Sequence, residues 1–311
     1  MVWSCLVSIL PGMAQTEKLT DYVNPFVGTD GYGNVYPGAE IPFGGIQISP
    51  DTDSRFYDAA SGYKYNHLTL MGFSLTHLSG TGIPDLGDFL FIPGTGEMKL
   101  EPGTHEDPDQ GYRSRYSHDK EWASPNYYAV ELADYGVKAE MTSGVRSGMF
   151  RFIYPESDNA FIMIDMNHTL WQSCEWSNLR MINDSTITGY KLVKGWGPER
   201  HVYFTATFSK KLTGLRFVQD KKPVIYNTSR FRSSYEAWGK NLMACISFDT
   251  KAGEEVIVKT AISSVSTNGA KNNMAELAGL AFDDLKAKGE ALWEKELGKY
   301  TLTADRKTKR T

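Results

Sequence analysis

Between Gly72 and Pro93 the chain reads GFSLTHLSGTGIPDLGDFLFIP, two apolar runs that enclose a loop rich in polar side chains. The loop carries a histidine, two hydroxyls and two carboxylates, at His77, Ser79, Thr81, Asp85 and Asp88. Glycoside hydrolysis requires two carboxylates a few ångströms apart, one as acid and one as base or nucleophile. Aspartates in loops also commonly accept hydrogen bonds from their own backbone. The stretch is therefore either part of a site or a turn held by internal hydrogen bonds.

Other short patterns do not match known ligand loops. The segment DTD at 51–53 opens like an EF-hand calcium loop, but Phe56 and Gly62 stand where that loop needs glycine and glutamate. The glycine-rich segment 28–33 lacks the GxGxxG spacing of a dinucleotide loop. The chain also has no GxSxG elbow for a nucleophile.

Histidines and loop aromatics are the remaining candidates. Histidine can do acid–base work, although a lone histidine is more often a partner in a polar network, and the candidates are His77, His168 and His201. Aromatic faces either stack on the apolar faces of sugars or pack into a core. Those in or beside expected loops are Tyr57, Tyr63, Tyr65, Trp171, Trp176 and Trp196.

Composition narrows the class of protein. A length of 311 residues predicts one large or two modest domains, and the 13% aromatic content favours sheet over helix. The formal charge is −4, and the one basic run is a short tail at 305–311. A nucleic-acid binder would usually be basic with clustered Lys and Arg, so no nucleic-acid partner is expected.

The N-terminus predicts export. Residues 2–10 are apolar but too short to span a membrane, and small residues precede Gln15. This pattern is typical of a signal peptide over residues 1–14, cleaved after Ala14. No later segment reaches transmembrane length. Cleavage would leave Cys174 and Cys245, which form one disulfide or remain buried thiols.

Secondary structure is expected to be mainly β, with helices at the end. Strands are predicted by alternating or apolar runs at 126–133, 136–142, 148–154, 160–166, 186–192, 201–208, 242–248 and 255–262. Such close, regular spacing predicts an antiparallel sandwich over residues 21–267. Residues 268–300 have helical spacing, and Gly289 is expected to divide them into two helices. Their apolar face either packs back on the sheet or belongs to a linker toward a missing domain, and it is expected to lack a partner within this chain.

Longer blocks resemble glycoside hydrolase family 92, the exo-acting α-mannosidases. The likeness is carried by residues 22–52 (YVNPFVGTDGYGNVYPGAEIPFGGIQISPDT), 61–65 (SGYKY) and 72–88, and it continues through 256–273. The resemblance implies a super-β-sandwich similar to galactose mutarotase, then linker helices at 268–300, then a C-terminal (α/α)6 barrel. The chain ends after the linker, so it resembles the N-terminal part of such an enzyme.

The resemblance also implies a mechanism and partners. Family members invert configuration, bind Ca2+, and take a glutamate acid and an aspartate base from the barrel. No catalytic residue or metal ligand is therefore assigned to this chain, which is expected to be inactive alone. The implied partners are mannose-containing glycans, including N-glycans, and the barrel domain, in a secreted or periplasmic bacterial protein.

What the resemblance places in this chain is one side of the mannose pocket. In the family, loops of the N-terminal domain cover that pocket, and the matching residues are Gly28, Thr29, Asp30, Tyr57, Asp58, Gly62, Tyr63, His77, Ser79, Gly80 and Thr81. The family often has tryptophan where Tyr57 stands and cysteine where Ala60 stands. These departures bear on linkage specificity.

Three readings of the whole chain remain open: a fragment of an α-mannosidase, a free-standing carbohydrate-binding module, or a domain that docks onto a separate barrel. Two readings of His77 also remain. As a pocket wall, its removal should leave stability unchanged and lower catalysis in a complete enzyme. As part of a structural turn, its removal should destabilise the domain. The expectation taken from the resemblance is the pocket wall.

Overall fold

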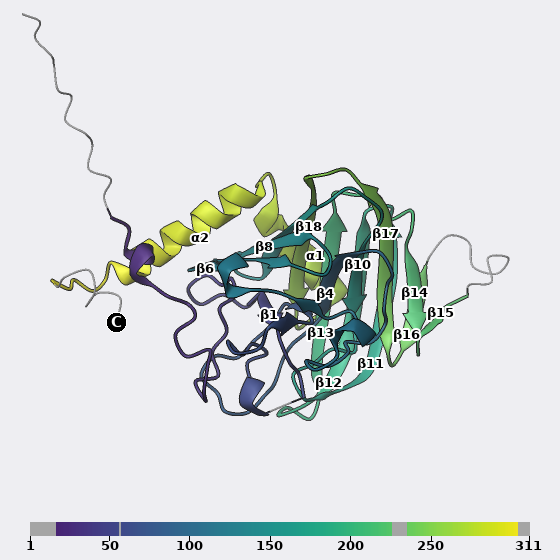
Figure 1. The fold of residues 1–311 in the computed structure, drawn as a ribbon, viewed down its shortest axis with the longest axis horizontal. Coiled ribbons are helices and arrows are strands. Elements are labelled where there is room, and N and C mark those ends of the chain that lie inside the picture. The colour runs from purple at the N-terminus through teal and green to yellow at the C-terminus, as the bar shows by residue number, and fades with distance from the viewer. Residues whose placement is uncertain (1–16, 56, 226–234, 304–311) are drawn as a thin grey trace, which may run out of the picture.

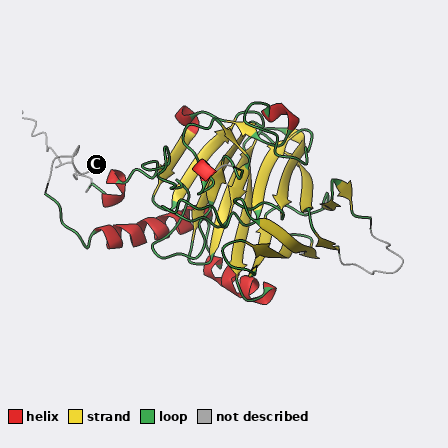
Figure 2. Ribbon diagram, turned by 90° about the horizontal axis from the view of Figure 1, so that it is seen from below, coloured by secondary structure: helices red, strands yellow, loops and turns green. Residues whose placement is uncertain are grey.

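The fold is a β-sandwich, seen in a computed structural model that describes residues 17–55, 57–225 and 235–303. Two large sheets lie face to face, and the long C-terminal helix α2 (Phe282–Leu297) lies at one side of them (Figures 1 and 2). Neighbouring strands pair antiparallel throughout the longer ladders, such as β10 with β17 and β11 with β12. The predicted antiparallel sandwich is therefore confirmed.

The smaller of the two main sheets has seven strands and supplies most of the residues discussed below. Its order is β1 (Ser49–Asp51), β3 (Gly72–Ser74), β4 (Leu90–Thr95), β10 (Ser157–Asp165), β17 (Leu242–Thr250), β14 (Arg216–Gln219) and β15 (Lys222–Pro223). A separate two-stranded ladder pairs β2 (Thr69–Leu70) with β5 (Ser114–Arg115). The stretch 72–93 thus begins in β3 and ends in β4.

The larger sheet has nine strands. Its order is β16 (Glu236–Gly239), β11 (Ser173–Asn183), β12 (Thr186–Lys194), β13 (Arg200–Phe208), β18 (Glu254–Ser263), β9 (Ser147–Tyr154), β8 (Val137–Ser143), β7 (Tyr127–Leu132) and β6 (Glu121–Ser124). The predicted strands all fall on members of the two sheets, with boundaries that differ by a few residues.

The main core fills the space between the sheets. Side chains alternate faces along a strand, so every second residue of β8 points inward, as Val137, Ala139 and Met141 do. Phe150 and Phe152 of β9 stack on each other with their ring centroids 5.3 Å apart. A second apolar layer, which includes Met71, Phe161 and Met243, lies on the outer face of the seven-stranded sheet.

The C-terminal helices pack on the nine-stranded sheet, so the expectation of an unpartnered apolar face is wrong. They comprise α1 (Thr267–Asn273), the 3-10 turn η5 (Met274–Leu277) and α2 (Phe282–Leu297). Leu277, Phe282 and Leu285 are buried against Met149 of β9. The apolar stripe therefore finds its partner in the outer face of the sheet, which is itself apolar there.

Gly289 does not divide the helices, contrary to the expectation. The break lies between η5 and α2, where Gly279 has a φ of +72°. Gly289 lies inside α2. A larger residue would not fit there, because its Cβ would come within 1.7 Å of the Asn126 side-chain nitrogen. A glycine in the helix interior thus marks close packing against the sheet rather than a helix end.

The N-terminal end of the described chain is tied to the same helix. The 3-10 turn η1 (Leu19–Tyr22) lies beside α2 in Figure 1. Thr20 donates from its backbone nitrogen (2.7 Å) and its hydroxyl (2.6 Å) to Glu294. The expected signal peptide, residues 1–14, lies outside the described residues.

Two sequence questions are answered by burial. Cys174 and Cys245 are both buried free thiols, so they do not form a disulfide with each other here. Burial raises the pKa of the Cys174 thiol and raises that of Cys245 to about 11, which keeps both in the unreactive thiol form. None of the helices in the described residues is long and apolar enough to cross a membrane.

Candidate functional site

The three loops that the resemblance assigns to a pocket meet at one end of the sandwich. The backbone of Gly80 donates to the Asn34 carbonyl oxygen (2.7 Å), which joins the loop after β3 to the loop 28–34. The short 3-10 turn η2 (Tyr57–Ala59) brings the Tyr57 hydroxyl against Gly82. Segments far apart in sequence therefore form one continuous end surface.

A carboxylate clamped by two histidines lies beneath this surface. The Asp51 side chain is fully buried, and its two oxygens lie 2.8 Å from His77 Nε2 and 2.8 Å from His168 Nε2. The other nitrogen of His77, Nδ1, donates to the Gln47 carbonyl oxygen (2.8 Å). Burial raises the pKa of the Asp51 carboxyl, but its contacts with both histidines outweigh burial and hold that pKa below its usual range.

Gly62 is required by this arrangement. Its φ is +87°, and a Cβ at this position would lie 2.1 Å from Asp51 Oδ1. Its carbonyl oxygen accepts hydrogen bonds from the backbone nitrogens of Thr52 (2.7 Å) and Asp53 (3.2 Å). Only glycine combines this backbone conformation with so close an approach to a buried carboxylate.

A second buried carboxylate, Asp88, is balanced by two cations. Its Oδ1 lies 3.1 Å from Lys191 Nζ, its Oδ2 lies 2.5 Å from Arg200 Nη1, and the Thr76 hydroxyl donates to Oδ2 (2.7 Å). Burial raises the pKa of the Asp88 carboxyl, but Lys191 and Arg200 reverse the shift and lower that pKa. Lys191 also donates to the His168 carbonyl oxygen (2.5 Å), so the two carboxylate clusters are joined.

Asp85 and Asp88 therefore act as anchors of the fold and not as a paired acid and base. Asp85 accepts hydrogen bonds from the backbone nitrogens of Leu86 (2.6 Å) and Trp196 (3.2 Å). Asp88 is fully enclosed by its cations, with no exposed side-chain area. The loop thus fixes the backbone of a neighbouring loop, which carries Trp196.

Three aromatic side chains stand exposed over these buried clusters, and we call them the aromatic rim: Tyr57, Trp171 and Trp196. They are 51%, 60% and 64% exposed. Tyr57 and Trp171 meet edge to face with ring centroids 6.3 Å apart. A Cβ on Gly195 would touch the side chain of Gln172, so the loops that carry the two tryptophans are neighbours.

The backbone under the rim is strained. Trp171 has a φ of +70°, and Leu86 and Phe89 in the facing loop have φ values of +74° and +59°. Bulky residues rarely adopt this region, and each such residue costs about 1 kcal/mol or more. The two strained loops are joined by the Leu170 nitrogen, which donates to the Leu86 carbonyl oxygen (3.0 Å). Strain of this kind clusters at ligand-binding sites, so it marks the Trp171 loop as a functional candidate.

The residues that the sequence assigned to the pocket separate into exposed and buried sets. Tyr57, Asp30, Ser79 and Gly80 are exposed, and Gly28 and Thr81 are partly exposed. Thr29, Gly62, Tyr63 and His77 are buried. The side chain of Asp58 lies outside the described part of the chain.

The buried set serves the fold rather than the surface. The Tyr63 hydroxyl donates to Glu121 (2.9 Å), and the Thr29 hydroxyl donates to the Phe26 carbonyl oxygen (2.8 Å). His77 has no exposed side-chain area and is held by Asp51, which favours the reading of this loop as a structural turn. Trp171 and Trp196 were noted as loop aromatics, but their places in the rim depend on loop contacts that sequence spacing does not reveal.

The described residues offer little to a metal ion. Among residues 17–55, 57–225 and 235–303, no group of three or more His, Cys, Asp or Glu side chains could hold a metal ion. Asp51 and Asp53, which begin and end the DTD segment, are instead engaged by histidine or arginine side chains. The described residues of the DTD segment thus do not fit a calcium loop.

Comparison with solved structures finds close relatives. A family GH92 alpha-mannosidase from Bacteroides thetaiotaomicron, solved with mannoimidazole, is 96% identical with a TM-score of 0.93, over 95% of this chain and 39% of that one. A family GH92 inverting mannosidase from the same organism is 24% identical with a TM-score of 0.80, over 96% of this chain and 38% of that one, and shows the shared fold. This chain therefore spans about two fifths of the length of these relatives.

Sequence comparisons agree. An uncharacterized secreted glycosidase from the fungus Arthroderma benhamiae is 30% identical over 139 residues, which are 44% of this chain and 17% of that protein. The family model for the glycosyl hydrolase family 92 N-terminal domain matches residues 22–263. Because that match covers most of the chain, the chain belongs to glycosyl hydrolase family 92, as its N-terminal domain.

Proposed function

We propose that this domain forms one wall of the sugar pocket of an α-mannosidase that acts on mannose-containing glycans. The observation that carries the proposal is the aromatic rim, which is exposed and partly strained, and whose Trp196 backbone is held by buried Asp85. Exposed aromatic faces suit the apolar faces of sugar rings, while the indole N–H and phenol O–H remain available to water or hydroxyls. The 96% identical relative, described as an alpha-mannosidase, supports the choice of sugar.

Within this proposal the chain's residues bind and orient the sugar and exclude water from one side. Tyr57, Trp171 and Trp196 stack on the sugar, and the Ser79 and Thr81 hydroxyls bond its hydroxyl groups. Gly80 has open space beside its Cα, so a ligand can approach its backbone closely. Asp51, Asp88 and their partners hold the loops and do not touch the sugar.

The acid and the base of the reaction are assigned to the remainder of a full-length enzyme. Hydrolysis with inversion needs two carboxylates on opposite faces of the sugar ring, with room for a water molecule. The two carboxylates beneath the rim, Asp51 and Asp88, are buried and paired, so they cannot serve. We likewise assign the calcium ion that the resemblance implies to residues outside this chain, and we expect the chain alone not to hydrolyse aryl α-mannosides.

We also propose that the protein is exported. The apolar stretch at residues 2–10 and the small residues before Gln15 support cleavage after Ala14. The Arthroderma relative, described as a secreted glycosidase, agrees with this proposal. N-terminal sequencing of protein from the medium or periplasm should begin at Gln15, and an intact Met1 on such protein would contradict export by this route.

A free-standing carbohydrate-binding or docking module is the second candidate. The observation that favours it is that the rim is exposed in this chain, where it can contact a glycan without a further domain. In that case the isolated chain should bind mannosides as tightly as a full-length family enzyme does. Substitutions in the rim would then leave catalysis by the full-length enzyme unchanged.

The deciding experiment compares rim and control variants in a full-length family 92 enzyme that contains this domain. Trp171→Ala and Trp196→Ala should each lower kcat/KM for α-mannosides by about 10–100-fold, which corresponds to about 1.4–2.7 kcal/mol of lost transition-state binding. The matched control is Trp122→Ala, since Trp122 is 44% exposed on edge strand β6, outside the rim. Equal kinetics for rim and control variants would refute the proposal.

A further inference from the structure

Two lysine side chains are buried among the described residues, Lys191 and Lys64. Lysine is almost never fully buried unless its charged end is paired. Lys191 joins the two buried carboxylate clusters, through Asp88 and a backbone carbonyl oxygen. The side chain of Lys64 is 6% exposed, and its Nζ donates to the Gly31 carbonyl oxygen (2.6 Å), which belongs to a surface loop. The two buried lysines therefore hold different parts of the site.

The loop that Lys64 reaches, 28–34, is exposed at its tip, residues 30–32. Tyr32 in this tip is 85% exposed, and Gly31 beside it has a φ of +60°, a conformation that glycine adopts without strain. Among the described residues, Lys64 is the one group from outside the loop that forms a hydrogen bond to the tip. The position of the tip thus depends on a side chain distant in sequence.

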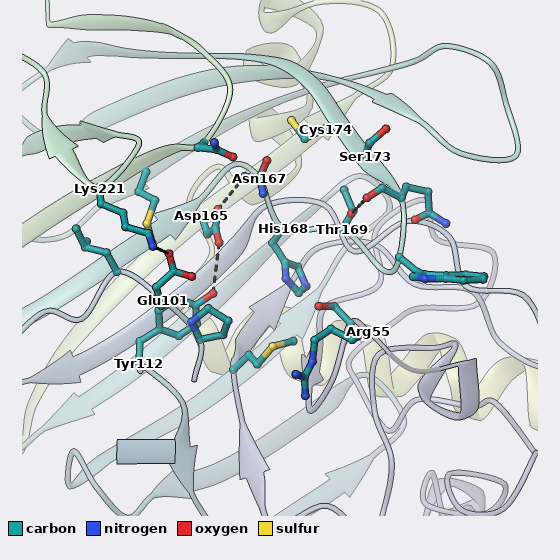
Figure 3. Close-up of a pocket in the computed structure, with 18 of the residues that line it drawn as sticks. Arg55, Glu101, Tyr112, Asp165, Asn167, His168, Thr169, Ser173, Cys174 and Lys221 are labelled. Carbon is teal, nitrogen blue, oxygen red and sulfur yellow. Dashed lines mark hydrogen bonds and ion pairs between the residues drawn. The ribbon is translucent and has the colours of Figure 1, made fainter. Parts of the chain in front are cut away.

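The other end of Lys64 is fixed in the buried part of the site. Its backbone nitrogen donates to the Thr52 hydroxyl (3.0 Å). Thr52 directly follows Asp51, the carboxylate that His77 and His168 clamp. His168 in turn lines the hollow that Figure 3 shows. Lys64 therefore connects a buried, hydrogen-bonded cluster with an exposed loop.

The loop 28–34 contacts the proposed sugar wall directly. The Asn34 carbonyl oxygen accepts a hydrogen bond from the Gly80 nitrogen (2.7 Å). A Cβ on Gly82 would lie 3.9 Å from Asn34 Nδ2 and 3.4 Å from the Tyr57 hydroxyl, so these groups are neighbours. Gly80 is where a ligand can approach the backbone closely, and Tyr57 belongs to the rim. A shift of the loop should therefore also move the backbone at Gly80.

A charged donor suits this task better than an apolar side chain would. Hydrogen bonds from charged groups contribute more than neutral ones, and the Gly31 carbonyl oxygen lies at the end of the lysine side chain. The same Nζ lies 5.8 Å from the centroid of the Tyr32 ring, within the range of a cation–π contact. One buried lysine thus restrains both the backbone and the exposed ring of the loop tip.

We propose that Lys64 is a positioning residue for the sugar pocket. It holds the tip of the loop 28–34 and, through Asn34, sets the position of the Gly80 backbone. This inference rests on the proposed function, because the wall that the loop supports is the proposed sugar contact. Lys64 itself does not touch the sugar, so its loss should weaken substrate binding and leave the chemical step unchanged.

The kinetic test uses a full-length family 92 enzyme that contains this domain. Lys64→Met keeps the length of the side chain and removes the donor. It should raise KM for α-mannosides at least about five-fold with kcat nearly unchanged, the pattern of a lost contact that serves ground state and transition state equally. Lys64→Arg, which keeps a charged donor, should recover most of the loss. The matched control is Lys211→Met, since Lys211 is 76% exposed and far in sequence from these loops.

A second readout follows the loops without any sugar. In the 311-residue chain, Lys64→Met should speed hydrogen–deuterium exchange at least several-fold in the peptide that covers 77–82, because the Gly80 N–H then loses its fixed acceptor. Peptides from β8 and β9 should exchange as in the parent chain. Thermal melts check that the variants fold. Should Lys64→Met fail to fold, Lys64→Gln, which is one atom shorter and uncharged, takes its place.

The outcomes separate this inference from the proposed function. Unchanged exchange at 77–82 would show that Lys64 does not position the loops. Faster exchange with the parent's KM, in an enzyme where Trp171→Ala lowers kcat/KM, would make Lys64 purely structural while the proposed function stands. If neither Lys64→Met nor Trp171→Ala alters catalysis, the proposed function fails and this inference fails with it.

Discussion

The buried clusters and the aromatic rim lie at the same end of the sandwich but differ in how far their side chains are buried and paired. In the clusters, Asp51 and Asp88 are fully buried and every charge has a partner within about 3 Å. In the rim, Trp171 and Trp196 are more than half exposed, and Trp171 has a strained backbone. The charged groups of one region are paired within the chain, whereas the largest side chains of the other region remain mostly exposed.

This difference separates stability from recognition. A buried ion pair that loses one member leaves an uncompensated charge, which destabilises the fold. An exposed aromatic ring contributes little to folding, so its removal should be felt mainly by a ligand. The predictions below test that separation, from the largest expected effect on stability to the smallest.

Asp88→Asn should produce the largest loss. The substitution keeps the shape of the side chain but leaves the buried Lys191 without its carboxylate, which should lower the free energy of unfolding by about 3–5 kcal/mol. Chemical denaturation measures the change. The matched control is Asp109→Asn in the exposed pair with Arg115, where less than about 1 kcal/mol is expected. Equal changes for the two variants would contradict the assigned role of the cluster.

Much of the fold was predictable from sequence because it depends on local patterns. The period-two alternation of β8 and its neighbours identifies strands directly, and the longer blocks identify the family. The packing of the C-terminal helices was predicted wrongly, because their apolar stripe does not show that Met149 of β9 packs against it. Gly289 was misread for the same reason, since its contact with Asn126 is distant in sequence.

The candidate site was less predictable because it is built from long-range contacts. Asp51 is separated in sequence from His77 by 26 positions and from His168 by 117. No short motif therefore predicts that these three side chains meet. Positive φ at Trp171 follows from the packing of its loop on Leu86 and has no signature in residue type. Only the three loops themselves were located in advance, and that came from the resemblance.

His77→Ala should have the next largest effect. It removes the donors to Asp51 and to the Gln47 carbonyl oxygen, and the buried acceptors then remain unsatisfied. The free energy of unfolding should fall by about 1–3 kcal/mol, as measured by denaturation. The pocket-wall reading of His77 instead requires an unchanged free energy of unfolding and a large loss of catalysis per folded molecule.

Acid should weaken the clusters in a defined direction. The pKa values of Asp51 and Asp88 are lowered in the folded state, so the unfolded chain takes up protons first as the pH falls. Their stabilisation is therefore complete above an unfolded pKa of about 3.9 and is lost below it. Denaturation between about pH 5 and pH 2 should show a steep fall for the parent chain and a shallower one for Asp88→Asn, which lacks one titrating group. Parallel profiles would contradict this origin.

The most direct test pairs two readouts on Trp171→Ala, with Asp88→Asn beside it, in a full-length family 92 enzyme. We expect Trp171→Ala to change the free energy of unfolding by less than about 0.5 kcal/mol, because the indole is mostly exposed, and to lower kcat/KM by about 10–100-fold. Asp88→Asn should show the reverse, with a large loss of stability and nearly unchanged kcat/KM per folded molecule. If Trp171→Ala unfolds the domain while catalysis per folded molecule persists, the rim is structural and the central claim is wrong.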